Sequence, residues 1–103
     1  MSDQEQSSVE MDTPSFIVGV GASAGGLAAL EDLFKTLPDD SGLAFVVIQH
    51  LSPDYKSMMV ELLSKHTAMP VLKIEDGMRP LANHLYLIPP RQTLAFMGGR
   101  LLL

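Results

Sequence analysis

The sequence predicts an α/β domain with a doubly wound, largely parallel sheet and an antiparallel β-hairpin. Two short apolar runs, residues 16–20 and 43–49, are typical of buried strands, and an amphipathic helix pattern separates them. A strand, a helix and a second strand within about 35 residues form a βαβ unit, whose two strands are parallel. Near the end of the chain, Gly98-Gly99 between two apolar runs indicates a two-residue hairpin turn.

The first strand is expected at Phe16–Val20, directly before a stretch of small residues at 21–26. Glycine and alanine let the chain turn sharply here and let the next helix pack closely on the strand. Pro38 marks the end of that helix. Its apolar residues recur at helical spacing and are expected to form one buried face: Leu27, Leu30, Leu33, Phe34 and Leu37.

The second strand, Leu43–Gln49, is apolar without alternation, as expected for a parallel strand that is covered on both faces. A second helix is expected to begin at Ser52-Pro53, because serine is a good N-cap and proline suits the first turn. Its buried face should comprise Met58, Met59, Leu62 and Leu63.

The remainder of the chain is rich in predicted strands. Short strands are expected at Val71–Ile74 and Leu85–Ile88, with a turn at Asp76-Gly77 between them. The hairpin should pair Thr93–Met97 with Arg100–Leu103. Because the chain stops within an apolar run, residues 15–103 are interpreted as the N-terminal part of a domain.

Composition excludes several functional classes. The net charge is −5, of which residues 1–12 contribute −4, and these residues belong to an acidic leader (1–14) that is expected to be disordered. An acidic chain without a basic cluster is not expected to bind nucleic acid. The longest apolar run has six residues, far fewer than the roughly 20 that span a bilayer, so no membrane insertion is expected and the cytoplasm is the default location. The chain lacks cysteine, which excludes disulfides and thiolate chemistry.

The stretch of small residues is compatible with two kinds of loop. Gly21-Ala22-Ser23-Ala24-Gly25 matches G-x-S-x-G, the strand-to-helix turn that exposes a nucleophilic serine. Residues 19–24 also match the looser dinucleotide-binding pattern G-x-G-x-x-G/A. That pattern requires an acidic residue at the end of the second strand, where this chain has Gln49 and His50. A phosphate-binding loop of the Walker type is excluded, because no Lys-Ser/Thr pair follows the glycines.

His50 favours the serine interpretation. The carboxyl ends of two parallel strands in a βαβ unit lie side by side, and Ser23 follows one strand whereas His50 follows the other. A serine hydroxyl needs an adjacent base to act as a nucleophile near neutral pH, and imidazole has a suitable pKa. Two structural alternatives stay open: a serine at this position is often a helix cap, and a histidine at a strand end is often only hydrogen-bonded.

The other histidines are expected to be structural. His66 lies near the end of the second helix, where a positive charge interacts favourably with the helix dipole. His84 follows Asn83 in what is interpreted as a solvated polar turn. No spacing typical of a metal site is present, so no metal is expected.

Four motifs occur in order: Gly-Ala-Ser-Ala-Gly-Gly at 21–26, Val-Ile-Gln-His-Leu-Ser-Pro at 47–53, Glu-Asp-Gly-Met at 75–78 and His-Leu-Tyr-Leu-Ile-Pro-Pro at 84–90. Together they resemble the catalytic domain of CheB-type chemotaxis protein-glutamate methylesterases, over residues 16–103. The sequences of these motifs are most similar to those of the methylesterase domains at the N-terminus of bifunctional methylesterase–methyltransferase proteins.

The resemblance implies a serine hydrolase that cleaves γ-glutamyl methyl esters on the cytoplasmic helices of methylated chemoreceptors. It implies Ser23 as nucleophile, His50 as general base and the main-chain N–H of Ala24 as an oxyanion donor, with no cofactor. The family's third catalytic residue is an aspartate from a later segment that these 103 residues do not contain, and neither Asp54 nor Asp76 matches its motif. A methyltransferase domain fused downstream is a further implied partner.

Because the aspartate is missing, residues 1–103 alone are expected to be weakly active or inactive. Two other functional classes remain as alternatives. One is a non-catalytic α/β module that binds a receptor or another partner, and the other is a nucleotide-binding domain.

Overall fold

A computed structural model describes residues 13–22, 27–49, 59–89 and 92–103. Four strands form one sheet in the order β1-β2-β4-β3, and all neighbouring pairs are parallel. They are β1 (Ile17–Ala22), β2 (Ala44–Gln49), β3 (Val71–Lys73) and β4 (His84–Leu87). The described helices are α2 (Leu27–Thr36) and α3 (Met59–Ser64), and β5 (Ala95–Met97) pairs with β6 (Arg100–Leu102) in an antiparallel hairpin. The predicted fold class is therefore confirmed.

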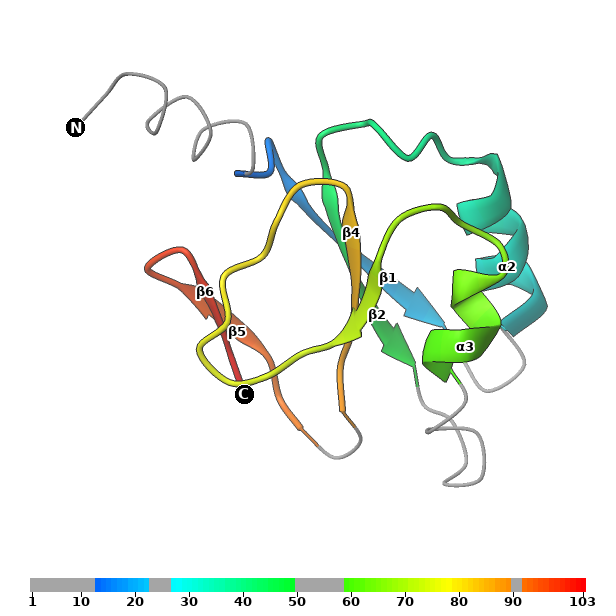
Figure 1. Ribbon diagram of the computed structural model, residues 1–103. Coiled ribbons are helices and arrows are strands. Elements are labelled where there is room, and N and C mark those ends of the chain that lie inside the picture. Colours follow the sequence, from blue (N-terminus) through cyan, green and yellow to red (C-terminus); the bar gives the residue numbers. More distant parts are fainter. Residues whose placement is uncertain (1–12, 23–26, 50–58, 90–91) are drawn as a thin grey trace, which may run out of the picture.

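The sheet separates two apolar clusters, because successive side chains of a strand point to opposite faces. Phe45 and Val47 of β2 face α2 and α3, whereas Ala44 and Val46 face the side on which the hairpin lies. Leu101 of β6 is fully buried in the second cluster. In Figure 1 both helices lie on one side of the sheet and the hairpin on the other.

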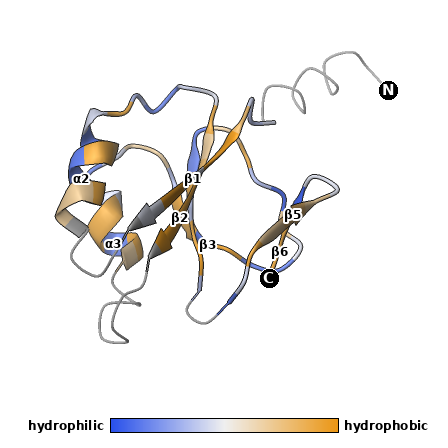
Figure 2. Ribbon diagram, turned by 180° about the vertical axis from the view of Figure 1, so that it is seen from behind, coloured by the Kyte–Doolittle hydropathy of each residue, from blue (hydrophilic) through white to orange (hydrophobic). Residues whose placement is uncertain are grey.

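Helix α2 packs on the sheet through Leu30 and Phe34, and the Phe34 ring meets Phe45 edge to face, with the ring centroids 5.6 Å apart. The prediction that Leu33 belongs to this face was wrong, since 37% of its surface is exposed. At 100° per residue Leu33 lies at the margin of the stripe centred on Leu30 and Phe34. Figure 2 shows hydrophobic and hydrophilic residues alternating along this helix.

Most expected strands are observed within one or two residues of their predicted limits, and β1 continues to Ala22, two residues beyond the expected end. Helix α3 is described from Met59, and Met59 and Leu63 are buried as predicted. The expected helix start at Ser52-Pro53 and the buried position of Met58 lie outside the described residues, as does most of the expected leader.

Gly98 and Gly99 form the hairpin turn with φ angles of 60° and 77°, as the two-residue turn requires. The hairpin is tied to the segment after β3, where Gly77 N–H donates to Leu101 O (2.7 Å) and Leu101 N–H donates to Met78 O (2.8 Å). These bonds hold β6 against the sheet face that the helices do not cover.

Candidate active site at the carboxyl ends of β1 and β2

The carboxyl ends of β1 and β2 lie side by side at one edge of the sheet. The parallel register pairs Val20 with Val47 and, as the last position of both strands, Ala22 with Gln49. Beyond β4, Ile88 N–H donates to Val47 O (3.2 Å), so the chain after β4 also continues along this end of β2. In open parallel sheets, loops at the carboxyl ends of the strands form the usual binding crevice.

Ser23, Ala24 and His50, the predicted catalytic residues, lie outside the described residues. The structure brings together the two residues that precede Ser23 and His50 in the sequence, namely Ala22 and Gln49. The contact between the serine hydroxyl and the imidazole stays a prediction.

Strand β2, which leads to this edge, is held in place by the burial of its side chains on both faces of the sheet. Val46 and Val47 of β2 are almost completely buried on opposite faces, whereas Ile48, near the end of the strand, is 44% exposed. Helix α2 begins at Leu27, only five positions after β1 ends. A strand, a four-residue connection and a helix form the arrangement that a G-x-S-x-G turn requires.

His66 has a structural role. It lies just past α3, as predicted, and its N–H donates to Leu63 O (3.0 Å) at the end of the helix. Its Nε2 lies 3.1 Å from Oε2 of Glu31 on α2, so the side chain also links the two helices. The link to Glu31 was not predicted, because nothing in the local sequence relates these two positions.

The prediction that His84 lies in a solvated turn was wrong. His84 is the first residue of β4 and is half-buried, with Nδ1 2.8 Å from Ala82 O and its ring stacked on Tyr86. The polar turn ends one residue earlier, at Asn83, which has a φ of 63°. Asparagine tolerates this left-handed conformation, which ends the turn and starts the strand.

The segment 75–78 anchors the hairpin. The Asp76 Oδ1 atom accepts a hydrogen bond from Leu103 N–H (2.9 Å), and an Arg100 guanidinium N–H donates to Gly77 O (2.8 Å). This motif lies in a turn with Gly77 at a φ of 85°. Asp76 thus stabilises the end of β6.

Tyr86 is buried in β4, and its hydroxyl oxygen accepts a hydrogen bond from Leu81 N–H (2.8 Å). Burial raises the pKa of this phenol above 10.0, and the Leu81 hydrogen bond opposes part of that rise. A neutral phenol that accepts a backbone hydrogen bond fits a packing role.

The described residues contain no cluster of three or more His, Cys, Asp or Glu residues that is suited to hold a metal ion. None of the helices described is both long and apolar enough to cross a membrane.

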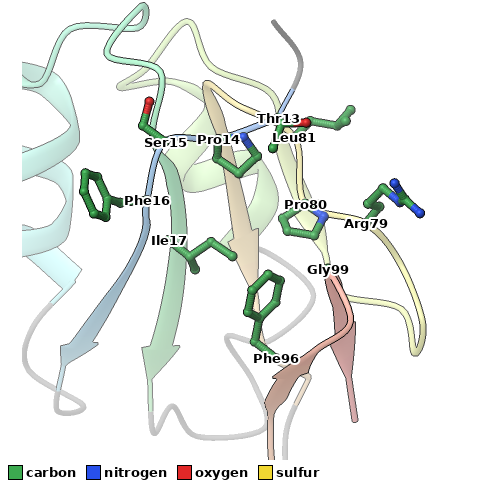
Figure 3. Close-up of a pocket in the computed structure, with 10 residues that line it drawn as sticks. All are labelled: Thr13, Pro14, Ser15, Phe16, Ile17, Arg79, Pro80, Leu81, Phe96 and Gly99. Carbon is green, nitrogen blue, oxygen red and sulfur yellow. The ribbon is translucent and has the colours of Figure 1, made fainter. Parts of the chain in front are cut away.

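A cavity of about 600 Å³ lies at the other end of β1, between its amino end and the hairpin. Ile17, Pro80 and Phe96 contribute apolar walls, and their side chains point toward one another in Figure 3. Arg79 also lines the cavity. Because Ile17 begins β1 and Ala22 ends it, this cavity is separate from the candidate active site.

The parallel sheet and the short strand-to-helix connection define an α/β domain of the kind that presents its chemistry at the carboxyl ends of its strands. The family model "CheB methylesterase" matches residues 18–101. The chain belongs to the CheB methylesterase family.

Two relatives agree with this assignment. The chain is 38% identical over 88 residues to a protein-glutamate methylesterase/protein-glutamine glutaminase of Xanthomonas oryzae, and 32% identical over 84 residues to one of Mesorhizobium japonicum. These matches cover 85% and 82% of this chain but 24% and 25% of the relatives, so the chain spans about a quarter of their length.

The fold is similar to the Thermotoga maritima CheB methylesterase catalytic domain, with a TM-score of 0.71 and 24% identity. The similarity covers 87% of this chain and 48% of that domain.

Proposed function

We propose that this chain carries the nucleophile and the general base of a protein-glutamate methylesterase that acts in the cytoplasm on methylated chemoreceptor helices. The observation that carries the proposal is the pairing of Ala22 with Gln49, since Ser23 and His50 follow these residues in the sequence. Consecutive Cα atoms are about 3.8 Å apart, so two residues that follow paired strand ends start from neighbouring positions. The register therefore supports a contact between hydroxyl and imidazole.

In the proposed reaction, His50 accepts the proton of Ser23 while Oγ forms a bond to the ester carbonyl carbon. The Ala24 N–H donates to the developing oxyanion. The tetrahedral intermediate collapses with cleavage of the bond to the methoxy oxygen, which takes the proton from His50 and leaves as methanol. His50 then deprotonates a water molecule, which attacks the acyl carbon, and Ser23 recovers its proton as the glutamate side chain is released.

The names of the relatives suggest a second substrate of the same kind. Protein-glutamine glutaminase activity needs the same acyl intermediate, with ammonia in place of methanol as the leaving group. The chain is further proposed to act together with an aspartate from a later segment and with a fused methyltransferase domain. Without such an aspartate, triads of this type lose roughly 10⁴-fold in turnover.

The test uses a chain in which these 103 residues are followed by the second half of the Xanthomonas oryzae methylesterase domain, here called the joined domain. Methanol release from methylated receptor is expected from the joined domain and lost with Ser23→Ala, while receptor binding persists. Ser15→Ala removes an exposed hydroxyl before β1 and serves as the control. Unchanged turnover in Ser23→Ala would refute the proposed nucleophile, and saturable NAD or ATP binding would favour the nucleotide-binding alternative.

A further inference from the structure

The cavity at the amino end of β1 leaves apolar surface uncovered. Phe96 is 52% exposed, although its side chain points into the cavity, toward Ile17 and Pro80 in Figure 3. Leu81 also lines the cavity and is more than one-third exposed. Apolar side chains that are gathered in one place and exposed in this way are typical of an interaction site.

A single cation stands beside this apolar surface. Among the described residues that line the cavity, Arg79 alone carries a charge, and none of the described acidic side chains forms an ion pair with it. In Figure 3 its guanidinium group points away from Pro80 and Phe96. An occupant that matches this arrangement has apolar side chains for the cavity and an acidic group beside them.

The segment that directly precedes the cavity in the sequence has this chemistry. Thr13 lines the cavity, and residues 9–12 before it read Val-Glu-Met-Asp. In an extended chain successive side chains point to opposite sides, so the two apolar side chains of this segment share one face and the two carboxylates share the other. The segment belongs to residues 1–12, which contribute a charge of −4.

Residues 9–12 are also tethered to the cavity wall. A chain spans at most about 3.6 Å per residue, so residue 9 lies within about 14 Å of Thr13. A segment tethered so closely has an effective concentration on the order of millimolar, whereas a second copy of the chain must also lose its translational and rotational freedom. Acidic segments without a fold of their own become ordered when they bind a surface. The tether therefore favours the leader of this chain as the occupant.

We propose that residues 9–12 dock in the cavity at the amino end of β1, with their apolar side chains inside and their carboxylates toward Arg79. The acidic leader then covers apolar surface that the described structure leaves exposed. This inference goes beyond the proposed function, because it concerns the end of β1 opposite the candidate active site and does not depend on the chemistry of Ser23.

The test measures cleavage of the joined domain by a glutamate-specific protease. Cleavage after Glu10 requires residues 9–12 to leave the cavity, whereas Glu5 lies outside the proposed segment and serves as the internal control. The ratio of the cleavage rate at Glu10 to that at Glu5 is compared with the same ratio in a synthetic peptide of residues 1–14, which has no cavity. The ratio is expected to be at least about 10-fold lower in the joined domain than in the peptide.

Variants of the joined domain test the charged and the apolar contacts separately. Arg79→Glu is expected to raise the ratio roughly 2- to 5-fold, and adding Asp12→Arg to this variant should restore part of the protection. Lys73→Glu makes the same change of charge at an exposed position of β3 and should leave the ratio unchanged. Met11→Ser removes an apolar contact and should raise the ratio. Each leader variant is compared with a peptide of its own sequence.

A second measurement observes the contact itself: the methyl group of Met11 should show a nuclear Overhauser effect to the ring of Phe96 in the joined domain. Cleavage after Glu10 at the rate found in the peptide would overturn the inference, and so would protection of Glu10 without this contact. Protection that increases with protein concentration would also overturn it, because a second copy would then supply the segment.

Discussion

The side-chain amide oxygen of Asn83 accepts a hydrogen bond of 2.7 Å from the backbone N–H of Gly42, 41 residues earlier in the chain. Asn83 N–H in turn donates to Leu43 O (2.8 Å). One residue thus ties the turn before β4 to the turn before β2. Since β2 and β4 are neighbours in the sheet, this pair of bonds fixes the amino ends of two buried strands.

Two substitutions of Asn83 should separate the contribution of its side-chain hydrogen bond to stability from that of its left-handed backbone conformation. Asn83→Ala loses the side-chain bond and places alanine at a φ of 63°, and should reduce the free energy of unfolding by about 1–3 kcal/mol. Asn83→Gly loses the bond but adopts this φ without strain, so its loss should be smaller. Urea unfolding of both variants measures the difference. Equal losses would show that the left-handed conformation carries no cost here.

Phe34 and Leu33 are neighbours in α2, but their replacement by alanine should destabilise the fold by very different amounts. Phe34 is 1% exposed and packs on Phe45, so Phe34→Ala should cost about 3–5 kcal/mol through lost contacts and the resulting cavity. Leu33→Ala should cost less than about 1 kcal/mol, because its side chain is more than one-third exposed. Thermal and urea unfolding measure both, and similar losses would contradict the observed orientation of the helix.

Features of the fold that depend on residues close in the sequence were predictable, whereas features that depend on contacts between distant residues were not. The βαβ unit and the Gly98-Gly99 turn were predictable because periodicity and turn chemistry are local signals. The position of β4 between β2 and β3 was not predictable, since strand order depends on contacts between distant residues. Leu33 was wrongly assigned to the buried face of α2, because the spacing of apolar residues along a helix does not show which of them lies at the edge of that face.

The same distinction applies to the candidate site. The sequence predicts a parallel βαβ unit, and the observed pairing of Ala22 with Gln49 agrees with it. Ser23 and His50 are the next residues in the sequence. The side-chain contact of His66 depends on a partner far away in the sequence, Glu31, whereas His84 contacts its near neighbours Ala82 and Tyr86. For Asp76 the local sequence predicts the Asp-Gly turn, but not its hydrogen-bond donor, Leu103, which lies 27 positions away.

Asp76 should stabilise the hairpin locally. Asp76→Ala removes the acceptor of Leu103 N–H, a surface hydrogen bond worth about 0.5–1.5 kcal/mol. The amides of Leu101 and Leu103 should exchange faster, while those in β2 and β4 keep their protection. Glu75→Ala, at the neighbouring exposed position, is the control and should leave both amides unchanged. Equal effects of the two substitutions would refute the anchoring role of Asp76.

Tyr86 should make stability depend on alkaline pH. Because burial raises the pKa of Tyr86 in the folded chain above its ordinary value of 10.0, the unfolded chain loses the phenolic proton first as the pH rises. The contribution to stability is thus complete below pH 10.0 and is lost as the pH rises through the folded-state pKa. Tyr86→Phe removes this dependence and the bond from Leu81 N–H, at a cost of about 1–2 kcal/mol at pH 8.

The difference between wild type and Tyr86→Phe should then shrink above pH 10.0, because only the wild type carries the buried phenol. Urea unfolding at pH 8 and at several values above 10 measures it. All other ionisable groups are common to both proteins, so their effects cancel in the comparison. A difference that stays constant or grows with pH would mean that Tyr86 ionises as readily in the folded chain as in the unfolded one, or more so.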